Sequence, residues 1–126
     1  MKDINTNIGF VGVGNLGRHA IFGLKDSYSI SASDPVQNEE IKNLGISYQT
    51  IEDLCKNSDV IFLTIKPNKA EEVLNKIRDL IEDKLIISFI AGMSLKKLKT
   101  LLSTSNVIRA MPCLLYTSPS PRDCLL

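Results

Sequence analysis

Cysteine and histidine are scarce in this chain of 126 residues, which holds three cysteines and one histidine. Cys55, Cys113 and Cys124 form no CxxC pair and no cluster of metal-ligand spacing with His19. The sequence therefore predicts no zinc site, no other metal site and no disulfide framework. We expect the thiols to be buried or incidental. His19 has no acidic or cysteine neighbour at helical spacing, so we assign it no catalytic role.

An excess of charge of one sign is also missing. Fifteen basic residues stand against fourteen acidic ones, which gives no field that favours nucleic acid or an anionic membrane surface. The longest apolar run, residues 60–65, is far too short to span a bilayer, and residues 1–7 lack the apolar core of a secretion signal. We therefore expect a cytosolic protein that binds neither nucleic acid nor membrane.

The most informative segment is the run IGFVGVGNLG at residues 8–17. It combines an apolar strand, a GxGxxG turn and a helix start, and each glycine has its own task in a turn built around a pyrophosphate. Gly12 takes the tight turn, Gly14 lets the backbone approach the phosphates, and Gly17 lets the helix pack closely on the strand. The N-terminal amides of that helix attract the anion. We therefore predict a dinucleotide site, in which Gly14→Ala weakens binding most.

The residues after the glycine turn support this prediction. Apolar residues at helical spacing follow it, and residues 28–33 then form a second strand that ends at Asp34. Dinucleotide folds place a carboxylate at about this distance along the chain, on the 2′-hydroxyl of the adenosine ribose. Such a carboxylate favours NAD and repels the additional phosphate of NADP. Ser33 and the backbone amides beyond Pro35 could still receive a phosphate, so the choice between NAD and NADP stays open.

The rest of the chain alternates between strands and helices. Further helices are predicted at residues 37–44, 50–56, 68–81 and 94–102, with Thr50 and Ser94 as N-caps and Asn68 with Glu71 as a capping pair. Further strands are predicted at residues 46–48, 60–65, 85–90 and 106–110. Such alternation requires right-handed crossovers and a mostly parallel sheet. The predicted fold is therefore α/β, a Rossmann-type doubly wound six-stranded sheet of order 3-2-1-4-5-6, with a ligand crevice at the carboxyl ends of the strands.

Several segments together resemble the pyrroline-5-carboxylate reductases, which use NAD(P)H to reduce the cyclic imine precursor of proline. The resemblance extends over residues 4–112 and rests on the glycine run and on ASDP (32–35), DVIFLTIKP (59–67), SFIAGMS (88–94) and VIRAMP (107–112). It implies that residues 1–112 form an NAD(P)-binding Rossmann domain of an oxidoreductase. The substrate partner implied is a cyclic imino acid, 1-pyrroline-5-carboxylate, which is reduced to L-proline. The full-length family member is expected to be a homo-oligomer, formed through a helical domain that follows this one.

The resemblance and the crevice topology predict one set of cofactor-binding residues. In the family, the turns after the fourth and fifth strands lie beside the ribose and nicotinamide of NADP or NAD. The Lys66 side chain is as well explained by a solvated strand end, and Ile51 stands where many family members carry an asparagine near the adenosine. We predict no catalytic side chain, and we interpret Arg109 as structural or crevice-lining. The predicted cofactor-binding residues are Gly12, Val13, Gly14, Asn15, Leu16, Gly17, Ser33, Asp34, Thr64, Ile65, Lys66, Pro67, Ala91 and Gly92.

The residues after Pro112 depart from the family. The segment CLLYTSPSPRDCLL at 113–126 shows no useful periodicity and no family continuation. It resembles translated adapter sequence joined to an assembled fragment, so we expect an unrelated tail outside the fold. In this interpretation the chain is the cofactor-binding part of the enzyme and turns over little or no substrate alone.

Two other functions remain open from the residues alone. A stand-alone dinucleotide-binding or sensing module would share every residue of the predicted cofactor site. Another Rossmann reductase, such as a hydroxyacid dehydrogenase, would share the glycine run. The segments at 59–67 and 107–112 favour the imine reductase over the second of these.

Overall fold

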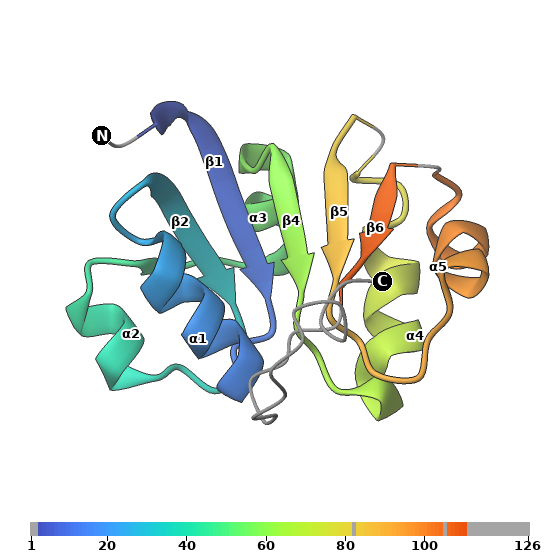
Figure 1. Cartoon of the computed structure of the whole chain (residues 1–126), viewed down its shortest axis with the longest axis horizontal. Helices are drawn as coiled ribbons and strands as arrows, with labels where there is room; N and C mark the ends of the chain where they lie inside the picture. Colours follow the sequence, from blue (N-terminus) through green and yellow to red (C-terminus); the bar gives the residue numbers. More distant parts are fainter. Residues whose placement is uncertain (1–2, 82, 105, 111–126) are drawn as a thin grey trace, which may run out of the picture.

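The structure is a computed structural model and describes residues 3–81, 83–104 and 106–110. Within them, six parallel strands form one sheet with helices on both faces (Figure 1). The strand order β3-β2-β1-β4-β5-β6 confirms the predicted Rossmann-type α/β fold. The strands are β1 (Asp3–Val11), β2 (Tyr28–Ser33), β3 (Ser47–Tyr48), β4 (Val60–Leu63), β5 (Leu85–Ser88) and β6 (Val107–Arg109). The helices are α1 (Asn15–Leu24), α2 (Glu39–Asn43), α3 (Ile51–Asn57), α4 (Pro67–Ile77) and α5 (Leu95–Leu102).

Two apolar cores lie on the two faces of the sheet. On one face, α1 and α2 bury Ile21 and Ile41 against Phe10 of β1. On the other face, α3, α4 and α5 pack on β4 and β5, with Leu74 and Leu98 fully buried there. Along β4, buried side chains alternate with partly exposed ones, so one face of this strand is completely covered and the other only in part. The two cores hold the strand ends in fixed positions, and the site is built on those ends.

The carboxyl ends of the central strands meet at one edge. The N–H of Gly12 donates to the carbonyl of Ser33 at 2.8 Å, and the N–H of Thr64 donates to the carbonyl of Val11 at 3.0 Å. These bonds extend the pairing of β1 with β2 and with β4 by one residue. The turns that follow the three strands are therefore aligned side by side.

The start and end of α4 differ from the prediction. Lys66 is the N-cap, and Pro67 occupies the first turn, where its missing N–H costs nothing. The predicted capping pair of Asn68 and Glu71 was therefore wrong. The helix ends at Ile77, because the N–H of Leu80 bonds to the carbonyl three residues back and turns the chain toward the buried Ile81.

Other elements are shifted at their ends. The helix α2 starts two residues late because Asn38 caps it, its Oδ1 accepting from the N–H groups of Glu40 and Ile41. β4 and β5 each stop two residues before the predicted end. β1 begins at Asp3 rather than at residue 8, because backbone pairing with Tyr28 does not require apolar side chains. Thr50 and Ser94 cap α3 and α5 as predicted.

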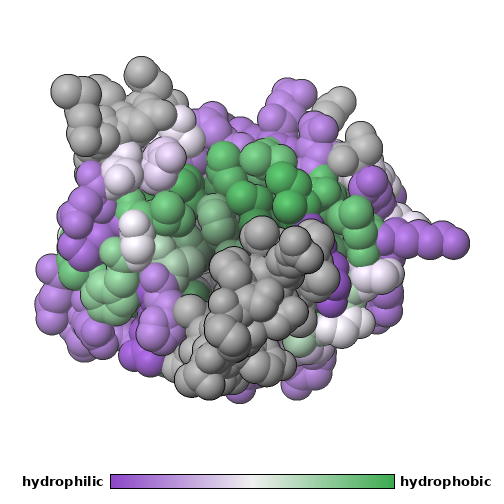
Figure 2. All heavy atoms as spheres, in the orientation of Figure 1, coloured by the Kyte–Doolittle hydropathy of each residue, from purple (hydrophilic) through white to green (hydrophobic). Residues whose placement is uncertain are grey.

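One sheet face remains open over β4 to β6. Among the described residues no helix crosses this face, which carries Phe62, Phe89 and the half-exposed Ile108. Figure 2 shows apolar surface in this region, flanked by hydrophilic side chains. None of the described helices is long and apolar enough to cross a membrane. The predicted tail at 113–126, including Cys113 and Cys124, lies outside the described residues.

Candidate cofactor site

A cavity of about 840 Å³ opens at the carboxyl edge of the sheet. Its walls come from the chain that follows β1, β2, β3 and β4, and its size is typical of a small-molecule site. Eight of the fourteen predicted cofactor-binding residues line it: Gly12, Val13, Gly14, Ser33, Asp34, Thr64, Ile65 and Lys66. The structure therefore brings together residues that lie far apart in the sequence.

The glycine turn has the conformation that its sequence predicts. Gly12 has a φ of +89°, and a Cβ there would lie 2.6 Å from Cγ2 of Ile65. Its carbonyl accepts a hydrogen bond from the Thr64 hydroxyl. Gly17 is also confined, because a Cβ there would lie 2.8 Å from Oγ1 of Thr64. These two glycines serve the close packing of α1 on the strands.

Gly14 has the opposite surroundings. A Cβ built on it meets no heavy atom within 4 Å, so the described protein places nothing in front of this backbone. Gly14 is also the N-cap of α1, which has no side-chain cap and no acidic residue in its first turn. In contrast, side chains cap α2, α3 and α5. The N-terminus of α1 therefore presents uncapped amides beside the cavity, as an anion site requires.

Asp34 is tied to the glycine turn. Its Oδ2 accepts from the N–H of Val13 at 2.6 Å, and its Oδ1 accepts from the N–H of Val36 at 2.8 Å. Hydrogen bonds from backbone N–H groups to a carboxylate are short and strong. Each carboxylate oxygen retains a second lone pair, so a ribose hydroxyl can still donate to it. Asp34 thus positions the turn and also lines the cavity.

The wall on the side of α4 carries positive charge. Lys66, Lys69 and Lys76 line the cavity, with Glu72 and Val73 between them. Among the described residues no ion pair involves these three lysines. Phosphate groups in the cavity would be attracted by this wall.

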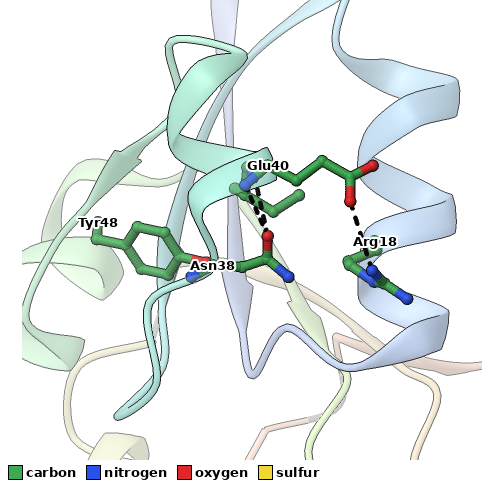
Figure 3. Close-up of polar contacts among 5 residues, drawn as sticks. Arg18, Asn38, Glu40 and Tyr48 are labelled. Carbon is green, nitrogen blue, oxygen red and sulfur yellow. Dashed lines mark hydrogen bonds and ion pairs between the residues drawn. The ribbon is translucent and has the colours of Figure 1, made fainter.

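The opposite end of the cavity is braced by polar contacts (Figure 3). The N–H of Asn38 donates to the hydroxyl of Tyr48 at 3.0 Å, which ties the start of α2 to β3. Arg18 of α1 forms an ion pair with Glu40 of α2 at 3.6 Å. These contacts fix the segment 35–38, two residues of which, Pro35 and Val36, line the cavity.

Some predicted residues lie elsewhere. Ala91 and Gly92 form an exposed turn after β5 and do not line the cavity. Pro67 starts α4, Leu16 and Gly17 belong to the first turn of α1, and Asn15 contributes its backbone to the helix N-terminus. Ala91, Gly92, Pro67, Leu16 and Gly17 are not among the described residues that form the cavity wall. Their role in cofactor binding stays a prediction.

Several lining residues were not predicted. They lie at the end of β1, after β2, after β3 or on α4, and they are Val11, Pro35, Val36, Gln49, Thr50, Ile51, Glu52, Lys69, Glu72, Val73 and Lys76. The predicted strand order places the end of β3 beside the end of β2, and this signal could have identified Gln49. Lys69, Val73 and Lys76 have helical spacing and therefore lie on one face of α4. This spacing is visible in the sequence and could have identified them.

Other polar residues take no part in the cavity. Cys55 is buried in α3, and burial, with a smaller contribution from Glu52, raises the pKa of its thiol to about 11, so it stays protonated near neutral pH. His19 is exposed on α1. Arg109 is partly buried at the end of β6, away from the cavity wall. The described residues contain no cluster of side chains that could hold a metal ion.

The cavity fits a dinucleotide in three independent respects. The space in front of Gly14 admits a phosphate, the lysine-lined wall supplies positive charge, and the Asp34 carboxylate stands where a ribose hydroxyl would donate. The residues present therefore suit NAD or NADP.

Comparison with known proteins agrees with this geometry. The family model described as "NADP oxidoreductase coenzyme F420-dependent" matches residues 7–92. The chain is 28% identical to the pyrroline-5-carboxylate reductase of Aquifex aeolicus over 118 residues, covering 86% of this chain and 43% of that protein. It is 32% identical to the Staphylococcus epidermidis enzyme over 115 residues, covering 82% and 42%.

A solved structure shows the same arrangement. The crystal structure of Plasmodium falciparum pyrroline carboxylate reductase with NADP bound superposes with a TM-score of 0.77 at 27% identity, over 86% of this chain and 42% of that one. The resemblance predicted from the sequence is thus confirmed. The chain spans less than half the length of these relatives.

Proposed function

The chain belongs to the family described as NADP oxidoreductase coenzyme F420-dependent, and on this premise we propose that it is the NAD(P)-binding part of a pyrroline-5-carboxylate reductase. The activity proposed for the whole enzyme is hydride transfer from NAD(P)H to 1-pyrroline-5-carboxylate, which yields L-proline. The relatives named above support this proposal.

One observation carries the proposal: the 840 Å³ cavity joins the glycine turn, Asp34 and the segment 64–66 at one sheet edge. A glycine turn alone is a weak signal, because such turns also connect strands and helices in proteins that bind nothing. Here the turn faces open space, an uncapped helix N-terminus and three lysines. This combination suits a pyrophosphate with a nucleoside attached.

The residues of this chain bind and orient the cofactor. NAD(P)H, when bound, supplies the hydride. The glycine turn and the α1 amides would hold the pyrophosphate, while Asp34 would hold the adenosine ribose. The segment 64–66 would lie toward the nicotinamide, since it follows the next strand along the sheet. The contribution of the protein is orientation, and no side chain of this part acts as a nucleophile.

The choice of cofactor is part of the proposal. Asp34 fixes a negative charge beside the ribose site. The hydrogen bonds that it accepts from two backbone N–H groups prevent the carboxylate from turning away. A 2′-phosphate placed there would be repelled. We therefore expect this chain to prefer NADH, in contrast to the relative whose structure contains NADP.

The boundaries of the cofactor-binding domain are also part of the proposal. We place the cofactor domain at residues 1–112 and treat 113–126 as an unrelated tail. A cyclic imino acid as substrate and a homo-oligomer of the longer polypeptide belong to the same proposal. A cytosolic location is also part of this proposal. Resequencing the locus beyond the codon for Pro112 tests the boundary.

Titration calorimetry tests the proposal directly. The chain should bind NADH with a measurable affinity and should produce little or no proline from 1-pyrroline-5-carboxylate, because more than half of the relatives' length is not covered. Absence of binding at millimolar NADH would contradict the cofactor role. Robust proline formation by the chain alone would contradict its assignment as a part.

A further inference from the structure

Gln49 lies directly beside the proposed ribose site. Its backbone N–H donates to the carbonyl of Ala32 at 2.7 Å, which continues the pairing of β2 with β3 by one residue. The preceding residue, Tyr48, is held through its hydroxyl by Asn38 (Figure 3). Gln49 is therefore fixed next to the end of β2, and both Gln49 and Asp34 line the cavity.

The side chain of Gln49 carries an oxygen without a partner. Oε1 is buried, and no donor among the described residues bonds to it. The residue as a whole is only partly buried, which places its amide at the boundary between the interior and the cavity. A buried amide oxygen is unfavourable until a donor reaches it, so a ligand with an N–H group here gains a hydrogen bond that the free chain lacks.

The order of strand ends indicates which part of a dinucleotide reaches this oxygen. Along the edge, β3 is followed by β2, β1 and β4. The glycine turn after β1 is the place for the pyrophosphate and Asp34 after β2 is the place for the ribose. The base then comes next, at the end of β3. Val36 and Ile51 line the cavity there and provide apolar contacts for a flat ring.

We propose that Gln49 recognises the adenine of the cofactor, an inference that rests on the function proposed above. The exocyclic amino group of adenine donates to Oε1 of Gln49, with a small rotation of the side chain toward the cavity. Hypoxanthine carries a carbonyl oxygen, an acceptor, in place of this amino group. Gln49 thus selects adenine dinucleotides over hypoxanthine dinucleotides.

Calorimetry with two dinucleotides tests this role on the whole 126-residue chain. NADH should bind about 5-fold more tightly than reduced nicotinamide hypoxanthine dinucleotide, as one hydrogen bond predicts. Gln49→Leu should weaken NADH to the level of the analogue and remove the preference. Gln49→Glu should preserve or increase the preference, because a carboxylate accepts from the amino group and has no N–H to donate to the hypoxanthine oxygen.

Gln37→Leu is the matched control, since Gln37 is exposed and does not line the cavity. It should leave both affinities unchanged, and circular dichroism should show that every variant is folded. Equal affinities of the unsubstituted chain for the two dinucleotides overturn the inference, as does a preference that survives in Gln49→Leu. If the unsubstituted chain binds neither dinucleotide, the proposed function fails, and the inference fails with it.

Discussion

The two halves of the crevice differ in how completely they are built. The adenosine half consists of the glycine turn, the segment 33–36 and the segment 49–52, and the nicotinamide half consists of the segment 64–67 and the turn at 91–92. In the adenosine half, backbone and side-chain hydrogen bonds fix Gly12, Asp34 and Gln49 around one cavity. In the nicotinamide half, residues 64–66 reach that cavity but the turn at 91–92 stays exposed.

This difference indicates where affinity and chemistry reside. A cradle for phosphate and adenosine needs only the ends of β1, β2 and β3, which the sheet holds in register. A nicotinamide site would need further contacts around the turn at 91–92, which the described residues do not supply. We therefore expect binding energy from the adenosine half and little catalysis from this chain alone.

The largest expected effect is a loss of folding stability at one of two glycines, one taken from each half. Gly12 and Gly92 both have positive φ, but only Gly12 is confined, by Ile65. Gly12→Ala should lower the free energy of unfolding by about 3 kcal/mol, from backbone strain and overpacking together. Gly92→Ala, which meets open space, should cost only about 1 kcal/mol. Urea unfolding followed by circular dichroism measures both, and equal losses would contradict the comparison.

Gly14→Ala should separate binding from stability. Its Cβ meets no protein atom, so the unfolding temperature should fall only slightly, because alanine is a poorer N-cap than glycine. NADH affinity should fall about 30-fold, or ~2 kcal/mol, because the methyl group occupies phosphate space. Gly23→Ala is the control, since Gly23 also has open space around it but lies in the last turn of α1, away from the cavity. It should raise stability by about 0.5–1 kcal/mol and leave binding unaltered. If Gly14→Ala bound NADH as tightly as the unsubstituted chain, the pyrophosphate could not bind at this turn.

Asp34→Asn tests the charge in the adenosine half. The unsubstituted chain should bind NADH more tightly than NADPH, and the variant should narrow this ratio about tenfold, or ~1.4 kcal/mol, by removing the charge that repels the 2′-phosphate. The amide oxygen can still accept from one of the two backbone N–H groups. Competition calorimetry gives the ratio. A clear preference of the unsubstituted chain for NADPH would contradict the role given to Asp34.

Cys55 provides a smaller effect in the core beneath the adenosine half. Its pKa of about 11 in the folded chain lies above the value of about 8.5 usual in unfolded chains. The neutral buried thiol therefore favours folding fully below about pH 8.5, and this contribution is lost as the pH rises toward 11. Between pH 8 and pH 9.5 the chain should lose on the order of 1 kcal/mol more than Cys55→Ala does. Urea unfolding at a series of pH values measures the stability of both proteins. If the stability of the unsubstituted chain and of Cys55→Ala changed equally with pH, the prediction would be contradicted.

The sequence predicts the fold well because its signals are local and redundant. Alternating apolar strands and helices, with Thr50 and Ser94 as caps, specify a sheet order that the structure confirms. Ends of elements were harder to predict. At α4 the proline at residue 67 starts the helix, although Asn68 and Glu71 form a plausible cap by themselves.

The candidate site was predicted in part. The glycine turn and Asp34 carry a motif, so their place in the cavity follows from spacing. Gln49 and the α4 lysines carry no motif, and they reach the cavity only through strand pairing and helix packing. Asp34 also bonds to Val13, a contact between two turns that no local pattern encodes.

The most direct test of the central claim compares NADH with ADP-ribose, which lacks the nicotinamide, on the 126-residue chain by titration calorimetry. If the adenosine half supplies the affinity, the two dissociation constants should agree within about threefold, or ~0.7 kcal/mol. NADH binding a hundredfold more tightly than ADP-ribose would show a working nicotinamide half and would contradict the account.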